Sequence, residues 1–498
     1  MMRVIKYILL IILVFSVFAG CKKDLAGLNE NPNDQTSINP DYLFKQSLKE
    51  GAGSYNSDVN VEQWGLMNWV MYLAARGGVI SGNEYVIPSG KDAFWNEQYI
   101  NALMQIQEVI NISGNDENMV NKKSASRIWK VFLFHRLTDL WGAVPYSDAL
   151  KGYSDLNYAP GYDQQHEIYL NMLDELKNAA LSFNSSAPFF NADADLIFSG
   201  DINSWIRFAN SLRLRLATRI KNADHDRYLE EMDDLSGKDL ISSNEQSALF
   251  PFNGQKKNHL YEAWYTNQAA AQNNPSKFLV DMLVSTNDPR ISVILEKTVM
   301  SIDYPWYDEY QGIPNLLPNS DPVWSTFDDD WRDVSAIGNW FLRDNTPGVL
   351  LSYAEVCFLL SEASLDGAYS LSDAQTLLNN GIRANMEFYN LHGDGSVLIT
   401  SGQIDSYLSS ITTCTLEDII TQKWLSFVFE NGYEAYAEYR RTGFPVLKNY
   451  DGTEIEKSIF PKRFIYPNSE TTLNRENYLK AIAVQGADNE FTKLWWNN

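Results

Sequence analysis

The spacing of apolar residues along most of the chain is that of amphipathic helices. Range 205–216 carries apolar side chains every three or four residues behind Asp201, and range 168–180 carries them every four residues behind Asp163. An aspartate just before such a run accepts hydrogen bonds from the free N–H groups of the first turn, so both aspartates are predicted helix caps. Dense apolar faces over several turns predict further helices in 124–141, 350–365 and 416–441.

Strand-like alternation is scarce, and only 85–88 and 464–466 are short strand candidates. Paired amphipathic helices without strands predict a mainly α fold, with TPR-like helix pairs forming an α-solenoid body. A clean 34-residue repeat is missing, so this interpretation rests on the helix pattern alone. Between 297 and 347 the pattern gives way to Pro, Gly, Asn and Asp with interspersed aromatic residues. Because loops on a rigid scaffold often carry binding groups, this range predicts a loop-rich binding surface.

The N-terminus has the layout of a bacterial lipoprotein signal. Two basic residues precede the uncharged run 8–19, which is too short for a membrane span of about 20 apolar residues. Two small residues and then Cys21 match the lipobox, so residues 1–20 are the predicted signal peptide and Cys21 the predicted lipid attachment site. Residues 21–40 then form a lipidated N-terminus and a polar, flexible tether. The alternative is an ordinary cleaved signal with a coincidental cysteine.

The composition narrows the class of protein. The net charge is −23, and removing residues 1–20 takes away two positive charges, which leaves −25. Such acidity argues against nucleic acid as a partner. Beyond Cys21 only Cys357 and Cys414 remain, too few for a disulfide framework, and the apolar surroundings of Cys357 predict a core residue.

No catalytic motif emerges from the reactive residues. The five histidines are scattered without an H-E-x-x-H pair, and neither a G-x-S-x-G elbow nor a P-loop occurs. With 63 acidic residues, a carboxylate pair for glycoside hydrolysis has no specificity. Asp328 and Asp330 belong to the densest carboxylate cluster and are candidate ligands for a structural Ca2+, with a solvated acidic loop as the alternative. We expect no other metal and no cofactor.

A set of short motifs runs in order along nearly the whole chain after Cys21. The most specific is Gln422-Lys423-Trp424 followed by Tyr439-Arg440-Arg441-Thr442-Gly443-Phe444-Pro445. In their order and coverage the motifs resemble those of the SusD/RagB family of outer-membrane nutrient-binding lipoproteins, in particular its SusD-like branch from Bacteroidetes. The other motifs are Leu28-Asn29-x-Asn31-Pro32-Asn33, Thr138-Asp139-Leu140-Trp141-Gly142, Trp205-Ile206-Arg207-Phe208-Ala209-Asn210, Asn287-Asp288-Pro289-Arg290, Tyr310-Gln311-Gly312, Tyr353-Ala354-Glu355 and Arg463-Phe464-x-Tyr466-Pro467.

The resemblance implies a surface-exposed, lipid-anchored protein of the bacterial outer membrane, with 41–498 as a single SusD-like helical domain. It implies that the protein acts as a lid over a SusC-type TonB-dependent transporter, captures glycans or other nutrients, and is not an enzyme. The shared motifs recur in relatives with different ligands, so we assign Asp139, Trp205, Arg440 and Arg441 to folding.

Ligand residues are then expected among the variable aromatics, because 41 Trp and Tyr residues supply rings that stack on sugar faces. The structural alternative for any one ring is core packing. Two further functions remain open: a helical-repeat adaptor that binds only protein, and a surface glycoside hydrolase. The candidate ligand residues are Arg76, Tyr85, Trp306, Tyr307 and Trp324, with Asp308 as an acceptor for sugar hydroxyls.

Overall fold

Helices make up most of the regular structure, as the apolar pattern predicts. The chain divides into two units, Met1–Pro40 and Asp41–Asn498, and almost all of the described residues belong to the second. The predicted signal peptide and Cys21 lie outside the described residues. In the described ranges, no helix combines the length and the apolar character needed to cross a membrane. The computed structural model describes residues 38–54, 56–76, 85–152, 155–254, 256–266, 273–318, 320–328 and 330–497.

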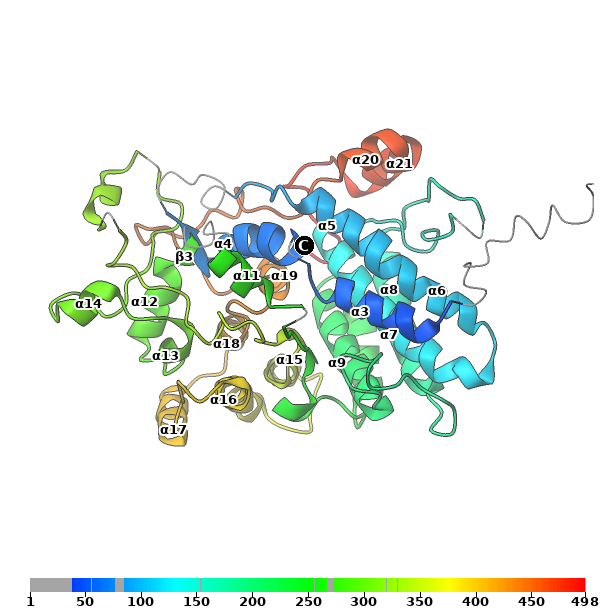
Figure 1. Cartoon of the computed structure of the whole chain (residues 1–498), viewed down its shortest axis with the longest axis horizontal. Helices are drawn as coiled ribbons and strands as arrows, with labels where there is room; N and C mark the ends of the chain where they lie inside the picture. The colour runs from blue at the N-terminus through cyan, green and yellow to red at the C-terminus, as the bar shows by residue number, and fades with distance from the viewer. Residues whose placement is uncertain are drawn as a thin grey trace, which may run out of the picture. The chain divides into compact units, whose positions relative to one another are not determined.

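The elements run in chain order through the second unit (Figure 1). The helices of the first half are α3 (Pro40–Gly51), η1 (Asn56–Leu66), α4 (Met67–Trp69), α5 (Lys91–Glu97), η3 (Gln98–Leu103), α6 (Met104–Ser113), η4 (Glu117–Met119), α7 (Val120–Trp141), α8 (Gln165–Ser182), α9 (Ile202–Ile220), α10 (His225–Leu235), η5 (Asn244–Gln246) and α11 (His259–Thr266). Those of the second half are α12 (Lys277–Ser285), α13 (Ile291–Ile294), α14 (Val299–Asp303), η7 (Pro322–Thr326), α15 (Tyr353–Leu365), α16 (Ala374–His392), α17 (Ser401–Ser410), α18 (Leu416–Ser426), α19 (Gly432–Thr442), α20 (Asn468–Leu473) and α21 (Arg475–Gln485). The strands are β1 (Leu73–Ala75), β2 (Ala248–Phe250), β3 (Asn273–Pro275) and β4 (Gly348–Leu351).

Consecutive helices pack against one another in pairs. Helix α7 packs against both α6 and α8, α9 packs against α8 and α10, and α15 packs against α16 and α18. In Figure 1 the helices α6 to α9 lie together on one side, while α12, α13 and α14 lie at the other end of the same view. The fold is therefore mainly helical and TPR-like, as predicted.

Two local predictions about helix ends have different outcomes. Asp201 is the N-cap of α9, because its carboxylate accepts from the N–H groups of Asn203 and Ser204, which confirms that cap. The prediction for Asp163 is wrong, since Gln164 caps α8 through a capping box with Glu167. The carboxylate of Asp163 instead accepts from the backbone N–H groups of residues 146 and 147.

The single helix expected in 416–441 is in fact two helices, α18 and α19. The apolar pattern continues through the break because Phe427, Val428 and Phe429 are all buried. The backbone of Phe429 lies in the left-handed region with φ 58°, and Asn431 then caps the new helix by accepting from the N–H of residue 434.

The predicted strands at 85–88 and 464–466 are also wrong. The strands present among the described residues form two short antiparallel pairs, β1 with β3 and β2 with β4. The backbone N–H of Phe464 donates to the carbonyl of Leu140, at the end of α7, rather than to a strand. Apolar residues in extended loops resemble strands in sequence, while each real strand depends on a partner far along the chain.

Buried ion pairs cross the helical core. Arg215 of α9 makes two 2.7 Å hydrogen bonds to the carboxylate of Glu355 in α15. Arg219, one turn further along α9, contacts Asp139 at 3.2 Å and also Glu434 of α19. These arginines are about 1% exposed, so each guanidinium needs its carboxylate inside the core. The pairs join α7, α9, α15 and α19 into one body.

Candidate functional site

The irregular segment predicted in 297–347 is anchored on the small β1–β3 sheet. The N–H of Ile313 donates to the carbonyl of Pro275 at 3.0 Å, and the amide of Asn315 donates to the carbonyl of Leu73 at 3.0 Å. Asn274 of β3 donates to the carbonyl of Ser335 at 3.3 Å. The β1–β3 sheet therefore holds the irregular segment in place through several hydrogen bonds.

Three half-buried aromatic rings, which we call the aromatic cluster, gather on this support: Trp324, Phe327 and Trp331. Phe327 and Trp331 are stacked with ring centroids 5.4 Å apart, and the Trp324 ring lies edge-on to Trp331 at 6.2 Å. The indole N–H of Trp324 donates to the carbonyl of Pro318 at 2.9 Å. The inner edge of the cluster packs on buried apolar residues, including Ile313.

Arg76 joins the aromatic cluster from the end of β1. Its guanidinium carbon lies 5.0 Å from the centroid of the Trp331 ring, and its Nε donates to the side chain of Asn274 at 3.0 Å. Burial lowers the pKa of Arg76 from its usual value. A guanidinium fixed beside half-exposed rings combines a flat apolar face with hydrogen-bond donors, which suits a ligand with apolar faces and polar edges.

The backbone of Trp331 is held in an unusual conformation. Its φ is 58°, in the left-handed region that a bulky residue rarely occupies. The carboxylate of Asp328 stabilises the turn by accepting from the N–H groups of Asp330 at 3.0 Å and Arg332 at 3.3 Å. Such local strain, retained by surrounding hydrogen bonds, is frequent at binding sites. The turn aims the Trp331 ring into the cluster.

A second aromatic group lies directly after α14, at the end of the helix and in the loop that follows. Trp306 is 77% exposed, and its ring lies 5.2 Å from that of Tyr304, which is itself 6.2 Å from Tyr307. Asp308 is exposed beside them. This group approaches the aromatic cluster through Arg332, whose carbonyl accepts from the N–H of residue 300 at 2.9 Å and whose guanidinium pairs with Asp303.

Tyr85 belongs to a different region. Its ring meets Phe460 edge-on at 5.2 Å, and it lines an apolar groove of about 700 Å³ together with Ile459 and Phe491. Burial raises the pKa of its hydroxyl. In the described part of the chain, no ring contact joins Tyr85 to the aromatic cluster. The structure thus brings Arg76 and Trp324 together through Trp331 and links the second aromatic group to them through Arg332. Tyr85 contacts Phe460 and shares its groove with Leu316 of the irregular segment.

The candidate metal ligands have other partners. Asp328 closes the turn described above, and Asp330 is exposed. One further group with suitable donor atoms occurs among the described residues, namely His135, Asp139 and Glu434. Arg219 contacts both carboxylates of that group, so each of them already has a cationic partner.

The motif residues assigned to folding are buried. Trp205 donates its indole N–H to Asp195 at 2.8 Å, and Arg441 binds Glu362 and Glu438. Arg440 donates to backbone carbonyls, including that of Asp139 at 2.7 Å.

Sequence reasoning missed two members of the site. Trp331 lies in the aromatic-rich stretch but is not among the candidate ligand residues. The role of Asn274 cannot be predicted from local sequence, because it follows from the pairing of β3 with β1. The one sequence feature that points to Asn274 is the run Asn273-Asn274-Pro275, which directly precedes Ser276, the N-cap of α12.

Comparison with known proteins agrees with the fold. The family model SusD-like, described as starch-binding and associating with the outer membrane, matches residues 32–467. A solved chitin-binding protein is 26% identical with a TM-score of 0.80, over 92% of this chain and 100% of that one. No curated protein matches.

Two further solved structures share the fold. A SusD-like protein of Bacteroidetes is 24% identical with a TM-score of 0.79, over 93% of this chain and all of the other. A chitin-binding SusD homologue from Flavobacterium johnsoniae is 23% identical with a TM-score of 0.75, over 92% and 98% of the two chains. The matched family consists of binding proteins rather than enzymes. The chain belongs to the SusD-like family, described as starch-binding and associating with the outer membrane.

Proposed function

We propose that this protein captures oligosaccharides at the aromatic cluster and delivers them, as a lid, to a SusC-type TonB-dependent transporter. The observation that carries the proposal is that Arg76, from a distant part of the chain, meets Trp324 and Trp331 of the irregular segment on one surface. Half-exposed rings stack on sugar faces, while the guanidinium donates to hydroxyl or acetamide oxygens. Trp306, Tyr307 and Asp308 extend this surface for a longer chain of sugars.

The nature of the relatives supports a glycan as the ligand. The family model is described as starch-binding, and two similar solved proteins are named as chitin-binding. Chitin consists of β-linked N-acetylglucosamine and starch of α-linked glucose, so a comparison of the two affinities distinguishes the two ligand classes. We therefore take N-acetylglucosamine and glucose oligosaccharides as the two test ligands.

Binding by calorimetry tests the proposal. Trp324→Ala and Trp331→Ala each remove ring area that covers a sugar face, which we expect to weaken binding roughly tenfold or more, about 1.5 to 3 kcal/mol. Tyr158→Ala is the matched control, because Tyr158 is a 77% exposed aromatic residue outside the site. Unchanged affinity in both tryptophan variants, with their folds intact, would remove the proposal.

The lid function requires an anchor and a partner. We propose that residues 1–20 are removed, that Cys21 carries the acyl chains, and that 21–40 tether the single domain 41–498 at the cell surface. Multiple acyl chains give stable anchoring, whereas one chain gives only reversible binding. Cys21→Ser should release the protein from the outer-membrane fraction without changing its affinity for oligosaccharides. Co-purification of a transporter barrel with the wild-type protein tests the partner.

A further inference from the structure

A basic pocket of about 650 Å³ lies at the C-terminal end of α19. Its wall comes from three segments, namely the end of α19, residues 457–462 and residues 491–497. Among the residues that the structure describes, no carboxylate lines it, although the whole chain carries a net charge of −23. We call it the basic pocket, and its charged lining residues are Arg440, Arg441, Lys457, Lys462 and Lys493.

Arg441 is the one cation of the basic pocket whose charge is matched. It forms ion pairs with Glu362 at 2.7 Å and Glu438 at 2.6 Å. Across the described ranges, no ion pair joins the other four cations to a carboxylate. Burial and the charges of Arg440, Lys457 and Lys493 lower the pKa of Lys462 to about 8. The four cations are thus close enough to repel one another.

The C-terminal end of α19 stabilises part of this positive charge. The carbonyl end of α19 attracts cations, and the ammonium of Lys457 lies 3.4 Å from where a side chain on Gly443 would begin. Lys462 and Lys493 come from other segments of the chain. The convergence of these cations makes the pocket locally positive and so attractive to an anion.

Two buried donors in the same wall have no acceptor. Arg440 is 7% exposed, and its Nε and Nη1 donate to the carbonyls of Tyr436, Asp139 and Lys462, while its Nη2 is left without a partner. Asn497 is also 7% exposed, and its Nδ2 is likewise unpartnered. Each buried donor without an acceptor costs about 1–3 kcal/mol. Neither atom has accessible surface, so an oxygen ligand in the pocket accepts from them only after the side chains move slightly.

We propose that the basic pocket binds an oxyanion, a sulfate or phosphate group that is free or carried as an ester. Lys457, Lys462 and Lys493 supply the opposite charge, and a small movement of the side chains of Arg440 and Asn497 brings Nη2 and Nδ2 to its oxygens. Several converging cations favour a tetrahedral oxyanion, which presents oxygens in several directions, over a single carboxylate. The site is independent of the aromatic cluster and adds an ionic ligand to a protein proposed to bind neutral sugars.

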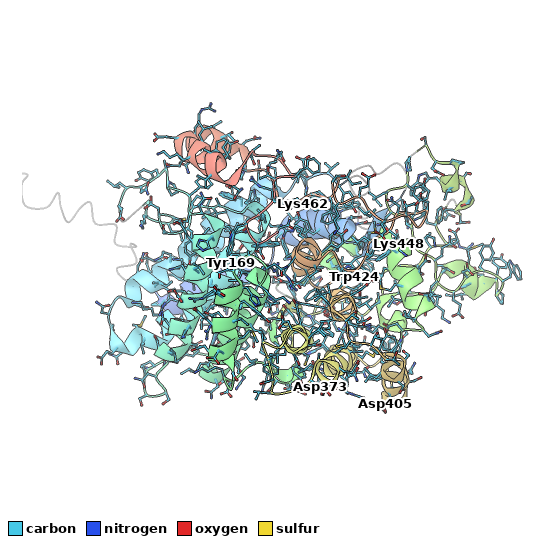
Figure 2. All side chains as sticks on the ribbon, turned by 180° about the vertical axis from the view of Figure 1, so that it is seen from behind. Tyr169, Asp373, Asp405, Trp424, Lys448 and Lys462 are labelled. Atoms are coloured by element: carbon cyan, nitrogen blue, oxygen red, sulfur yellow. The ribbon has the colours of Figure 1, made fainter. Side chains whose placement is uncertain are left out.

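Calorimetry with sodium sulfate and sodium phosphate, against sodium chloride at equal ionic strength, tests this site on the purified protein. Asn497→Asp places a negative charge in the wall and should weaken sulfate binding at least roughly tenfold; Lys493→Ala should weaken it several-fold. Lys448→Ala is the matched control, an exposed lysine outside the basic pocket, and Figure 2 labels it together with Lys462. Binding should also take up protons near pH 8, since the anion raises the pKa of Lys462 again.

The source of the oxyanion follows from two further titrations. N-acetylglucosamine 6-sulfate that binds more tightly than free sulfate assigns the anion to a sugar ester. Retention on phosphatidylglycerol vesicles, but not on phosphatidylcholine vesicles, assigns it to a lipid headgroup.

Two results would overturn the site. One is sulfate and phosphate binding no better than chloride, and the other is equal binding by Asn497→Asp, Lys493→Ala and Lys448→Ala. The proposed glycan function fails separately, because Lys493→Ala should leave the affinity for neutral oligosaccharides unchanged and Trp331→Ala should leave the affinity for sulfate unchanged.

Discussion

Glu62 provides a quantitative test of how the core handles buried charge. It lies in η1, is 7% exposed, and accepts a hydrogen bond from the backbone N–H of Gly432. Burial, and then the nearby carboxylate of Asp58, raise the pKa of Glu62 from 4.5 to about 8, although Arg136 acts in the opposite direction. Glu62→Gln keeps an oxygen acceptor for Gly432 and removes the ionisation.

The sign and size of the effect follow from proton binding. Between pH 4.5 and about 8 the folded protein keeps a proton on Glu62 that the unfolded chain has lost. The free energy of unfolding therefore falls as the pH rises through this window, by about 1.4 kcal/mol for each pH unit from this group. Over the whole window the loss approaches about 5 kcal/mol, an upper value because a core relaxes around a charge.

Urea denaturation at pH 5, 7 and 9 measures this loss. We expect Glu62→Gln to be similar to the wild type at pH 5 and more stable by several kcal/mol at pH 9. Glu230→Gln is the matched control, because Glu230 is exposed on α10. A difference between Glu62→Gln and wild type that does not grow with pH would refute the reasoning.

Two further predictions concern packing. Arg215→Met should lower the free energy of unfolding by about 3–5 kcal/mol because it leaves the buried Glu355 unpaired, and Arg215→Met with Glu355→Leu should recover most of that loss in urea denaturation. Gly338→Ala should lower the melting temperature, since a Cβ there would lie 1.8 Å from the carbonyl oxygen of Val293; Gly402→Ala, with open space around it, should leave the temperature unchanged or raise it. A double variant no more stable than Arg215→Met, or equal melting temperatures for the two glycine variants, would contradict these expectations.

Helices such as α8 and α9 could be predicted because apolar side chains recur at helical spacing in their sequences. The N-cap at Asp201 could also be predicted, since this aspartate directly precedes the apolar residues that recur at helical spacing in α9. The break between α18 and α19 was hidden because buried residues continue through it, and only Asn431 followed by Gly432 marks the new start. Strands of three residues carry too short a pattern to be recognised without their partners.

The candidate site was predictable only in part. Arg76 and Trp324 were chosen because polar and aromatic residues crowd a non-helical stretch, and they do share a surface. What joins them is Trp331, whose position depends on the β1–β3 pairing and on a left-handed turn. Such long-range contacts cannot be predicted from local composition. The same criterion also gives Tyr85 as a candidate, although its ring packs against Phe460 and not in the aromatic cluster.

A crystal structure of the protein with a bound oligosaccharide of N-acetylglucosamine or glucose tests the central claim most directly. The account predicts a sugar ring against the faces of Trp324 or Trp331, at van der Waals distances of about 3.5–4 Å, with Arg76 within hydrogen-bond reach of its oxygens. A sugar bound elsewhere, with the aromatic cluster left bare, would contradict the account.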